Sequence, residues 1–194
     1  FRDPKTRNVF TDKQLKARAI FFWIANNIAL DLKAIKMNDE KRSVPEEVVK
    51  NRKATSLGFA KLFQEMSSMA NIRCLLVDGY IKNNIDELND PEDDINHSWN
   101  VLQLGQSYVD AAKASGTTDK KMATFFKDFT SEYFFADRVL FNLDHYPKND
   151  TWQLGPGPKS LKEFYSLPII YNAAYKYGFR KPAPANGFIK TKPN

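Results

Sequence analysis

Residues 53–63 read Lys-Ala-Thr-Ser-Leu-Gly-Phe-Ala-Lys-Leu-Phe, and they open the most apolar helix that the sequence predicts. This helix is expected from Ser56 to Ala70, and Asn71 is suited to the left-handed residue that follows a helix end. Apolar residues cover most of its circumference: Leu57, Phe59, Ala60, Leu62, Phe63, Met66, Met69 and Ala70. A helix that is apolar all round is typical of a protein interior, so we expect it to be buried on nearly every side.

Shorter helices are predicted before and after it. Three capping-box patterns indicate where they start: Thr11 to Gln14, Ser43 to Glu46, and Ser160 to Glu163. The first is followed by apolar residues at helical spacing, which predicts a helix over about 12–28. Pro168 interrupts the last one.

Strand signals follow the central helix. Residues 74–81 form a short apolar run, and residues 97–103 and 107–110 alternate around a turn in which Gly105 can take a positive φ. Polar loops are expected at 82–95 and 113–121, whereas residues 125–154 have mixed periodicity and no predicted assignment. Helices followed by an antiparallel, hairpin-rich sheet favour the α+β class over α/β.

Length and composition limit what this chain can be. With 194 residues, 42% of them hydrophobic, the composition is that of a globular protein, and we expect one domain over 1–179 followed by a basic, Pro-containing tail or linker over 180–194. A single cysteine and two histidines make metal chemistry improbable, and no cofactor is expected. No apolar run approaches the ~18 residues of a membrane span. The net charge of +6 comes without a Lys/Arg block, so nucleic acid is not expected as a partner.

Three polar residues stand where acyl-transfer chemistry would need them. Ser56 lies in the first turn of the buried helix, where unpaired amides and the helix dipole stabilise negative charge. His97 starts one strand of the hairpin and Asp110 ends the returning strand, so their backbones are neighbours. In a catalytic triad the Asp holds the imidazole and the imidazole faces the nucleophile. Such residues are common, and this spacing alone is a weak signal.

Several motifs carry a resemblance to a known family. Residues 53–63 resemble the nucleophile helix of bacterial transglutaminase-like domains, which carries Gly-x-Cys-x-Gly-(Tyr/Phe)-Ala. Residues 96–101 are similar to its His-Ala-Trp-Asn-x-Val strand, and 108–111 to its Tyr-x-x-Asp-Thr segment. Residues 16–24 and 27–31 resemble its first helix, and 133–135, 145–147 and 152–154 resemble the ending found in the branch related to the kyphoscoliosis peptidase. The resemblance covers roughly Thr11 to Gly178.

This resemblance implies a papain-like α+β fold, with N-terminal helices packed on an antiparallel sheet, and a Cys-His-Asp triad for acyl transfer or amide hydrolysis. The family's positions fall on Ser56, His97 and Asp110. The chain departs from the pattern at the nucleophile, which is Ser56, and at the preceding Gly position, which is Ala54; Leu30 also stands where Tyr is usual. The expected acid and base are kept, and the thiol is missing.

The substitution weakens the nucleophile. A thiol with a pKa of ~8.5 ionises beside a histidine and a helix N-terminus, whereas a serine hydroxyl must lose its proton to a well-aligned base. A pocket shaped for sulfur leaves a hydroxyl misplaced, and about 1 Å costs ~100-fold. We therefore expect a pseudoenzyme that binds a peptide or protein in a groove beside Ser56. The alternatives are an active acyltransferase or amide hydrolase that uses Ser56, His97 and Asp110, or a cysteine enzyme deliberately changed to serine.

Other candidate residues favour structural roles. We expect His145 to serve packing or a turn, and Cys74 to be a small buried hydrophobe. Trp23 and Trp152 are typical of core positions, while Trp99 fits either the core or the groove. The acidic loop over 86–94 lacks a calcium-loop pattern, so a solvated loop is expected.

The sequence leaves the localisation and the oligomeric state undecided. A first residue other than Met and a basic tail are compatible with an exported bacterial protein, periplasmic or extracellular, and trimming of the chain explains both features equally well.

Overall fold

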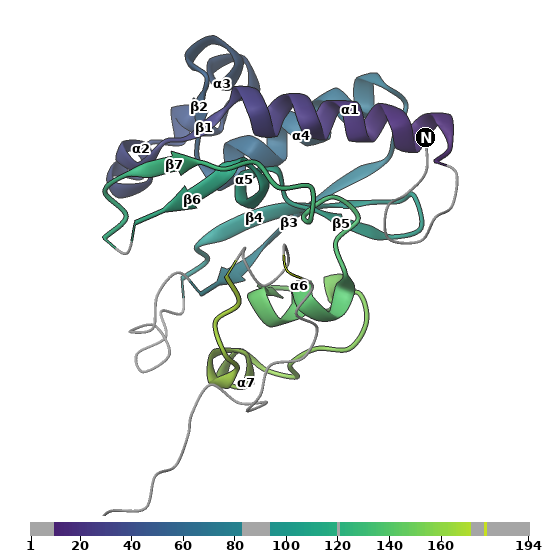
Figure 1. Ribbon diagram of the computed structural model, residues 1–194, viewed down its shortest axis with the longest axis vertical. Helices are drawn as coiled ribbons and strands as arrows, with labels where there is room; N and C mark the ends of the chain where they lie inside the picture. Colours follow the sequence, from purple (N-terminus) through teal and green to yellow (C-terminus); the bar gives the residue numbers. More distant parts are fainter. Residues whose placement is uncertain (1–9, 83–93, 120, 172–176, 178–194) are drawn as a thin grey trace, which may run out of the picture. The chain divides into compact units, whose positions relative to one another are not determined.

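The computed structural model describes residues 10–82, 94–119, 121–171 and 177 (Figure 1). Contacts divide the chain into two compact units: unit 1 is Phe1–Val77 with Ser98–Phe135, and unit 2 is Asp78–His97 with Ala136–Asn194. The expected domain over 1–179 and the tail over 180–194 stay predictions, since the tail lies outside the described residues.

Unit 1 contains most of the helices and the central hairpin. Its elements are α1 (Asp12–Asn27), β1 (Ala29–Leu30), α2 (Leu32–Met37), η1 (Glu40–Ser43), α3 (Pro45–Asn51), β2 (Lys53–Ala54), α4 (Ser56–Met69), the first half of β3 (Cys74–Ile81), β4 (His97–Leu102), β5 (Ser107–Val109), α5 (Ala111–Ser115), β6 (Gly116–Thr118) and β7 (Phe125–Lys127). His97, the first residue of β4, is counted in unit 2. In unit 1, α1, α3 and α5 contact α4, and Figure 1 shows α1 and α4 side by side.

The predicted capping box at the start of α1 is confirmed. The Thr11 side chain accepts from the Gln14 amide, and the Gln14 side chain accepts from the Thr11 amide at 2.8 Å. The helix ends at Asn27, one residue before the predicted end.

The central helix is also confirmed as α4, and Asn71 takes the expected left-handed conformation with φ of 55°. The expectation that it is buried on nearly every side is wrong. Lys61, Glu65 and Met69 are exposed, Met69 to 80%. Helices α1, α3 and α5 cover part of its surface and leave a ridge that includes two apolar side chains, Met66 and Met69, at or near the surface.

The hairpin forms as predicted. β4 and β5 are antiparallel, with Asn100 opposite Val109 and Leu102 opposite Ser107, and Gly105 has φ of 74°. They belong to a four-stranded sheet of order β5-β4-β3-β8, and β3 has the predicted bounds 74–81. Two-stranded sheets pair β1 with β2 and β6 with β7. The mixture of helices with an antiparallel sheet confirms the α+β class.

Two local predictions for unit 1 are wrong. Ser43 does not cap α3, whose N-cap is Val44 with no side-chain bond; the Ser43 hydroxyl instead lies 2.8 Å from the Thr55 hydroxyl. Residues 113–121 are not one polar loop, because Asp110 caps α5 and β6 follows directly. In both places a tertiary or cap partner outweighs the local composition.

Unit 2 contains the second half of β3 together with α6 (Arg138–Asp144), β8 (His145–Pro147), η3 (Asp150–Trp152) and α7 (Leu161–Ser166). The region without a predicted assignment thus holds β7, α6, β8 and η3. The capping box predicted at Ser160 is confirmed in part: the Ser160 hydroxyl accepts from the Glu163 amide at 3.1 Å, but the Glu163 carboxylate accepts from the Lys159 amide at 2.8 Å and not from that of Ser160. The predicted loop over 82–95 lies mostly outside the described residues, but Lys82 is buried, at 2% exposure, and does not behave as a solvated loop residue.

Large apolar side chains form the interior of each unit. In unit 1 they include Phe21, Phe59, Phe63, Trp99 and Tyr108; in unit 2, Tyr80, Tyr146, Phe164 and Tyr165 pack together. Trp99 is therefore a core residue. Within the described residues, no helix combines the length and the apolar character that a membrane crossing requires.

Candidate functional site

Ser56 is the first residue of α4. Thr55 is the N-cap: its hydroxyl accepts from the Gly58 amide at 3.2 Å, and its carbonyl accepts from the Phe59 amide at 3.0 Å. The first amides of a helix have no acceptor inside the helix. Thr55 satisfies the Gly58 amide, and no described residue accepts from the Ser56 or Leu57 amide. These two unpaired N–H groups lie at the positive end of a 14-residue helix, where they favour a negatively charged oxygen or sulfur.

The hydroxyl of Ser56 is half-buried and makes no hydrogen bond to a described residue. The hydroxyl is therefore not used for helix capping, which is the task of Thr55.

A close backbone contact fixes this turn. A Cβ added at Gly58 would lie 2.2 Å from the carbonyl oxygen of Arg42, so only glycine fits there. The same Arg42 carbonyl accepts from the Thr55 amide at 3.3 Å, and the Arg42 side chain pairs with Asp31 at 3.1 Å. The resemblance motif carries a glycine at this position, and the contact between η1 and α4 gives its physical reason.

Ala54, the departure from glycine just before the turn, is fully buried in β2. It does not have a positive φ, so its Cβ causes no backbone strain. The Asp31 amide donates to its carbonyl at 2.8 Å, which ties the turn to β1.

His97 is the first residue of β4 and is 6% exposed. The strand that carries it is held to α4 by Asn100, whose side-chain amide donates to the Ala60 carbonyl at 3.0 Å and to the Leu75 carbonyl at 3.3 Å. Asn100 follows the histidine in the sequence motif, and these bonds explain what it does. The strand register is therefore fixed three residues from His97.

Asp110 follows β5 directly and is 1% exposed. Its amide donates to the Tyr133 carbonyl at 3.0 Å, and its carboxylate accepts from the Lys113 amide at 2.9 Å as the N-cap of α5. Extending the β4–β5 register places Asp110 opposite Trp99, on the strand end that neighbours His97. Asp110 thus caps α5, whether or not it also orients an imidazole.

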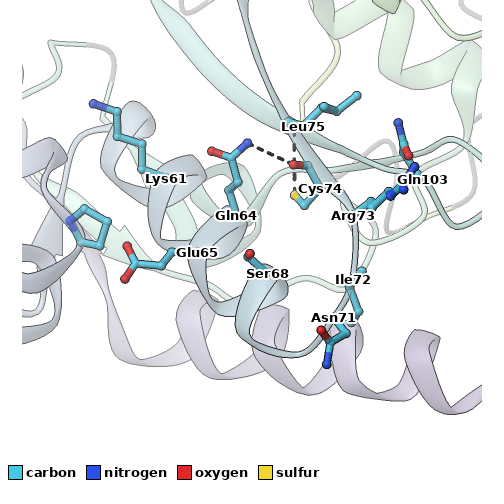
Figure 2. Close-up of a pocket in the computed structure, with 11 residues that line it drawn as sticks. Lys61, Gln64, Glu65, Ser68, Asn71, Ile72, Arg73, Cys74, Leu75 and Gln103 are labelled. Carbon is cyan, nitrogen blue, oxygen red and sulfur yellow. Dashed lines mark hydrogen bonds between the residues drawn. The ribbon is translucent and has the colours of Figure 1, made fainter.

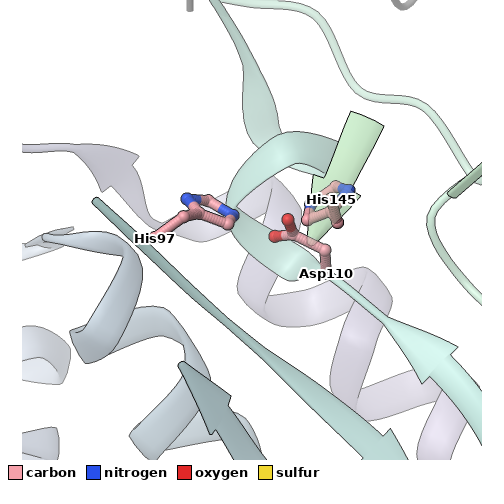
Figure 3. Close-up of side chains that lie close together, drawn as sticks. All are labelled: His97, Asp110 and His145. Carbon is pink, nitrogen blue, oxygen red and sulfur yellow. The ribbon is translucent and has the colours of Figure 1, made fainter. Parts of the chain in front are cut away.

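His145 was expected to serve only packing or a turn, and it does pack: its ring stacks on Phe141 at 3.8 Å. It is also close to His97, with ring centroids 5.4 Å apart. Figure 3 shows His97, Asp110 and His145 close together, with one ring nitrogen or carboxylate oxygen from each within 4.8 Å of the others. Two imidazoles and a carboxylate are also a donor set for a divalent transition metal, and the expectation that metal chemistry is improbable stays a prediction.

The position of His145 could not be predicted from local sequence signals. It depends on the pairing of β8 with β3, in which His145 lies opposite Ile81. The sequence predicts no secondary structure in that region, so it does not predict the pairing of β8 with β3.

Cys74 does not replace the missing thiol. It is partly buried, and burial raises the pKa of its thiol to about 12. A thiol with this pKa stays protonated at neutral pH and is a poor nucleophile. It lines a groove of about 950 Å³ in unit 1, shown in Figure 2, where the Gln64 side chain donates to the Cys74 carbonyl at 3.0 Å.

Comparison with known proteins identifies the family. The model of the transglutaminase-like superfamily matches residues 3–112, more than half of the chain. The chain belongs to the transglutaminase-like superfamily, which confirms the fold expected from the motifs.

Relatives come from animals and a yeast. The chain is 29% identical over 179 residues to the kyphoscoliosis peptidase of Mus musculus, covering 91% of this chain and 27% of that protein, and the same figures hold for the Homo sapiens protein. It is 25% identical over 178 residues to hillarin of Drosophila melanogaster, covering 84% of this chain and 21% of hillarin. The chain thus spans about a quarter of the length of the curated relatives it matches.

Proposed function

We propose that this chain is a transglutaminase-like domain that binds a peptide or protein without turning it over, with Ser56, His97 and Asp110 in the positions of the triad. The observation that carries the proposal is the start of α4. Ser56 begins this helix, at the position that the resemblance assigns to the family's cysteine, next to two amides from which no described residue accepts.

The chemistry of the hydroxyl supports a lack of turnover. A thiol becomes a thiolate in such surroundings before substrate arrives, whereas a serine must be deprotonated during attack by a base that already holds it. Serine chemistry therefore depends on a base that is aligned with the hydroxyl far more closely than thiolate chemistry requires. The unpaired amides of Ser56 and Leu57 remain able to bind a carbonyl or carboxylate oxygen of a ligand.

The test compares the natural chain with Ser56→Cys and Ser56→Ala. The probe is a glutamine-containing peptide with a primary amine, and the readouts are ammonia release and peptide hydrolysis. We expect no release by the natural chain or by Ser56→Ala, and slow, measurable release by Ser56→Cys. Ser68→Cys is the matched control, because it places a thiol on the exposed side of the same helix, and it should stay inactive.

The alternative function is an active serine hydrolase or acyltransferase. In that mechanism Ser56 attacks the carbonyl, His97 takes the proton, Asp110 orients His97, and the Ser56 amide donates to the oxyanion. Turnover by the natural chain that disappears in Ser56→Ala, together with labelling of Ser56 by a fluorophosphonate, would establish this alternative and overturn the proposal.

A further inference from the structure

An apolar groove of about 530 Å³ lies on unit 1 between α1, α3 and α4. Trp23, Val49, Leu62, Met66 and Met69 supply its apolar lining. Met69 is 80% exposed and Val49 38%, so apolar surface that is contiguous with the groove faces solvent, which marks interaction sites more often than single exposed side chains do. The groove is separate from the triad positions, none of which lines it. Its volume falls in the range of about 300–1,000 Å³ that is usual for binding pockets.

Acidic side chains outnumber basic ones in the lining of this groove. Glu46 and Glu65 line it, are exposed, and form no ion pair with a described residue. One basic residue, Lys50, also lines the groove, and its ammonium lies 3.8 Å from the Glu47 carboxylate, whereas the Arg52 guanidinium lies over the Trp23 ring at 4.9 Å. Because Lys50 pairs with Glu47, the two remaining carboxylates of Glu46 and Glu65 give the groove an excess of negative charge, on a chain whose net charge is +6.

The elements that form the groove restrict the conformation of an occupant. All three are helices, whose backbone groups are bonded within the helix. An extended segment laid here would find no strand edge to pair with, and its own amides would be buried without partners. A helix satisfies its own backbone and can bury one apolar face, and methionine side chains adapt to such faces.

We propose that this groove docks an amphipathic helix of a partner protein, with apolar residues at helical spacing toward Met66 and Met69 and Lys or Arg residues facing Glu46 and Glu65. The negative rim disfavours acidic helices and anionic membrane surfaces by like-charge repulsion. The inference goes beyond the proposed function, because it concerns another surface and needs no group of the triad.

The test uses two synthetic 18-residue helical peptides with the same leucine face. One carries lysines beside that face and the other carries glutamates, and binding to the full chain is measured by fluorescence anisotropy against salt concentration. We expect the lysine peptide to bind at least tenfold more tightly, with a difference that shrinks as salt rises. Equal binding of the two peptides, or no binding of the lysine peptide at about 1 mM, would overturn the proposal.

Variants locate the binding on the chain. Met69→Lys should weaken binding of the lysine peptide at least tenfold, and Glu46→Lys with Glu65→Lys should reverse the preference between the peptides. Met37→Lys is the matched control, because Met37 is 67% exposed on α2 and outside the groove, and it should bind as the natural chain does. Unchanged binding by Met69→Lys would overturn the assignment, as would a dimer of the natural chain that Met69→Lys dissociates in sedimentation. None of these variants should alter the turnover of Ser56→Cys, which separates this test from that of the proposed function.

Discussion

Helix α4 begins, and helix α7 ends, with backbone groups that have no partner in their own helix. At the end of α7, buried Lys82 donates to the carbonyls of Phe164, Leu167 and Pro168 at 3.1–3.3 Å. At the start of α4, Thr55 satisfies one amide, and those of Ser56 and Leu57 stay unpaired. The end of α7 is thus closed by a side chain, whereas the start of α4 leaves two amides from which no described residue accepts, and the proposed ligand binding rests on these amides.

The two termini also differ in what holds them. The carbonyls at the end of α7 are held by the side chain of Lys82, the residue after β3, whereas the start of α4 is positioned by backbone contact with η1. The Arg42 carbonyl accepts from the Thr55 amide, and Gly58 leaves room for it. The start of α4 is thus positioned without using the amides of Ser56 and Leu57.

Gly58→Ala should have the largest effect, because the new Cβ would meet the Arg42 carbonyl oxygen at 2.2 Å, and neither backbone segment can move without losing its hydrogen bonds. We expect a loss of at least about 3 kcal/mol in the free energy of unfolding, at the upper end of overpacking effects. Urea unfolding measures it.

Gly105→Asn is the control for this variant. Gly105 has φ of 74°, an added Cβ would lie no closer than 4.0 Å to its nearest neighbour, the Ser107 hydroxyl, and asparagine tolerates that backbone conformation, so the loss should stay below about 1 kcal/mol. Equal losses for the two variants would mean that η1 does not press against α4.

At these helix termini, the sequence predicts a hydrogen bond when its two partners lie close together along the chain. The caps at Thr11 and Ser160 and the turn at Gly105 are local, and each was predicted correctly. Lys82 was assigned to a polar loop, because its three acceptors come 82 to 86 residues later in the chain.

The candidate site shows the same limit. The resemblance motifs place Ser56, His97 and Asp110 on their elements, and those positions stay predictions as catalytic residues. The proximity of His145 to His97 depends on the pairing of β8 with β3, and the reason for Gly58 depends on η1. Both are tertiary contacts that no local pattern encodes.

A pH series tests whether Lys82, which binds the carbonyls at the end of α7, has a lowered pKa. Burial lowers the pKa of Lys82 from 10.5 to about 8, although the Asp144 carboxylate opposes the shift. Between these values the unfolded chain binds more protons than the folded one, so stability rises with pH. From about pH 7.5 to about pH 10 we expect an increase of roughly 2 kcal/mol from this group, measured by urea unfolding.

Lys82→Met isolates this contribution. Its side chain fills a similar volume without the ammonium group, so its stability should lack the increase that Lys82 adds over the same pH range. Parallel pH profiles for the natural chain and the variant would show that Lys82 does not titrate between those limits.

The smallest expected effect tests whether the start of α4 is electrostatically unsatisfied. Ser56→Asp puts a carboxylate beside the two unpaired amides and the positive end of the helix, so the free energy of unfolding should rise by about 0.5 kcal/mol at low salt and return toward the natural value at high salt. Ser68→Asp, near the other end of α4, should have the opposite sign, because a carboxylate there faces the negative end. If both variants lowered stability equally at low salt, the amides of Ser56 and Leu57 would already have acceptors. The contrast with α7 would then fail, and with it the reason for expecting an anionic ligand oxygen at Ser56.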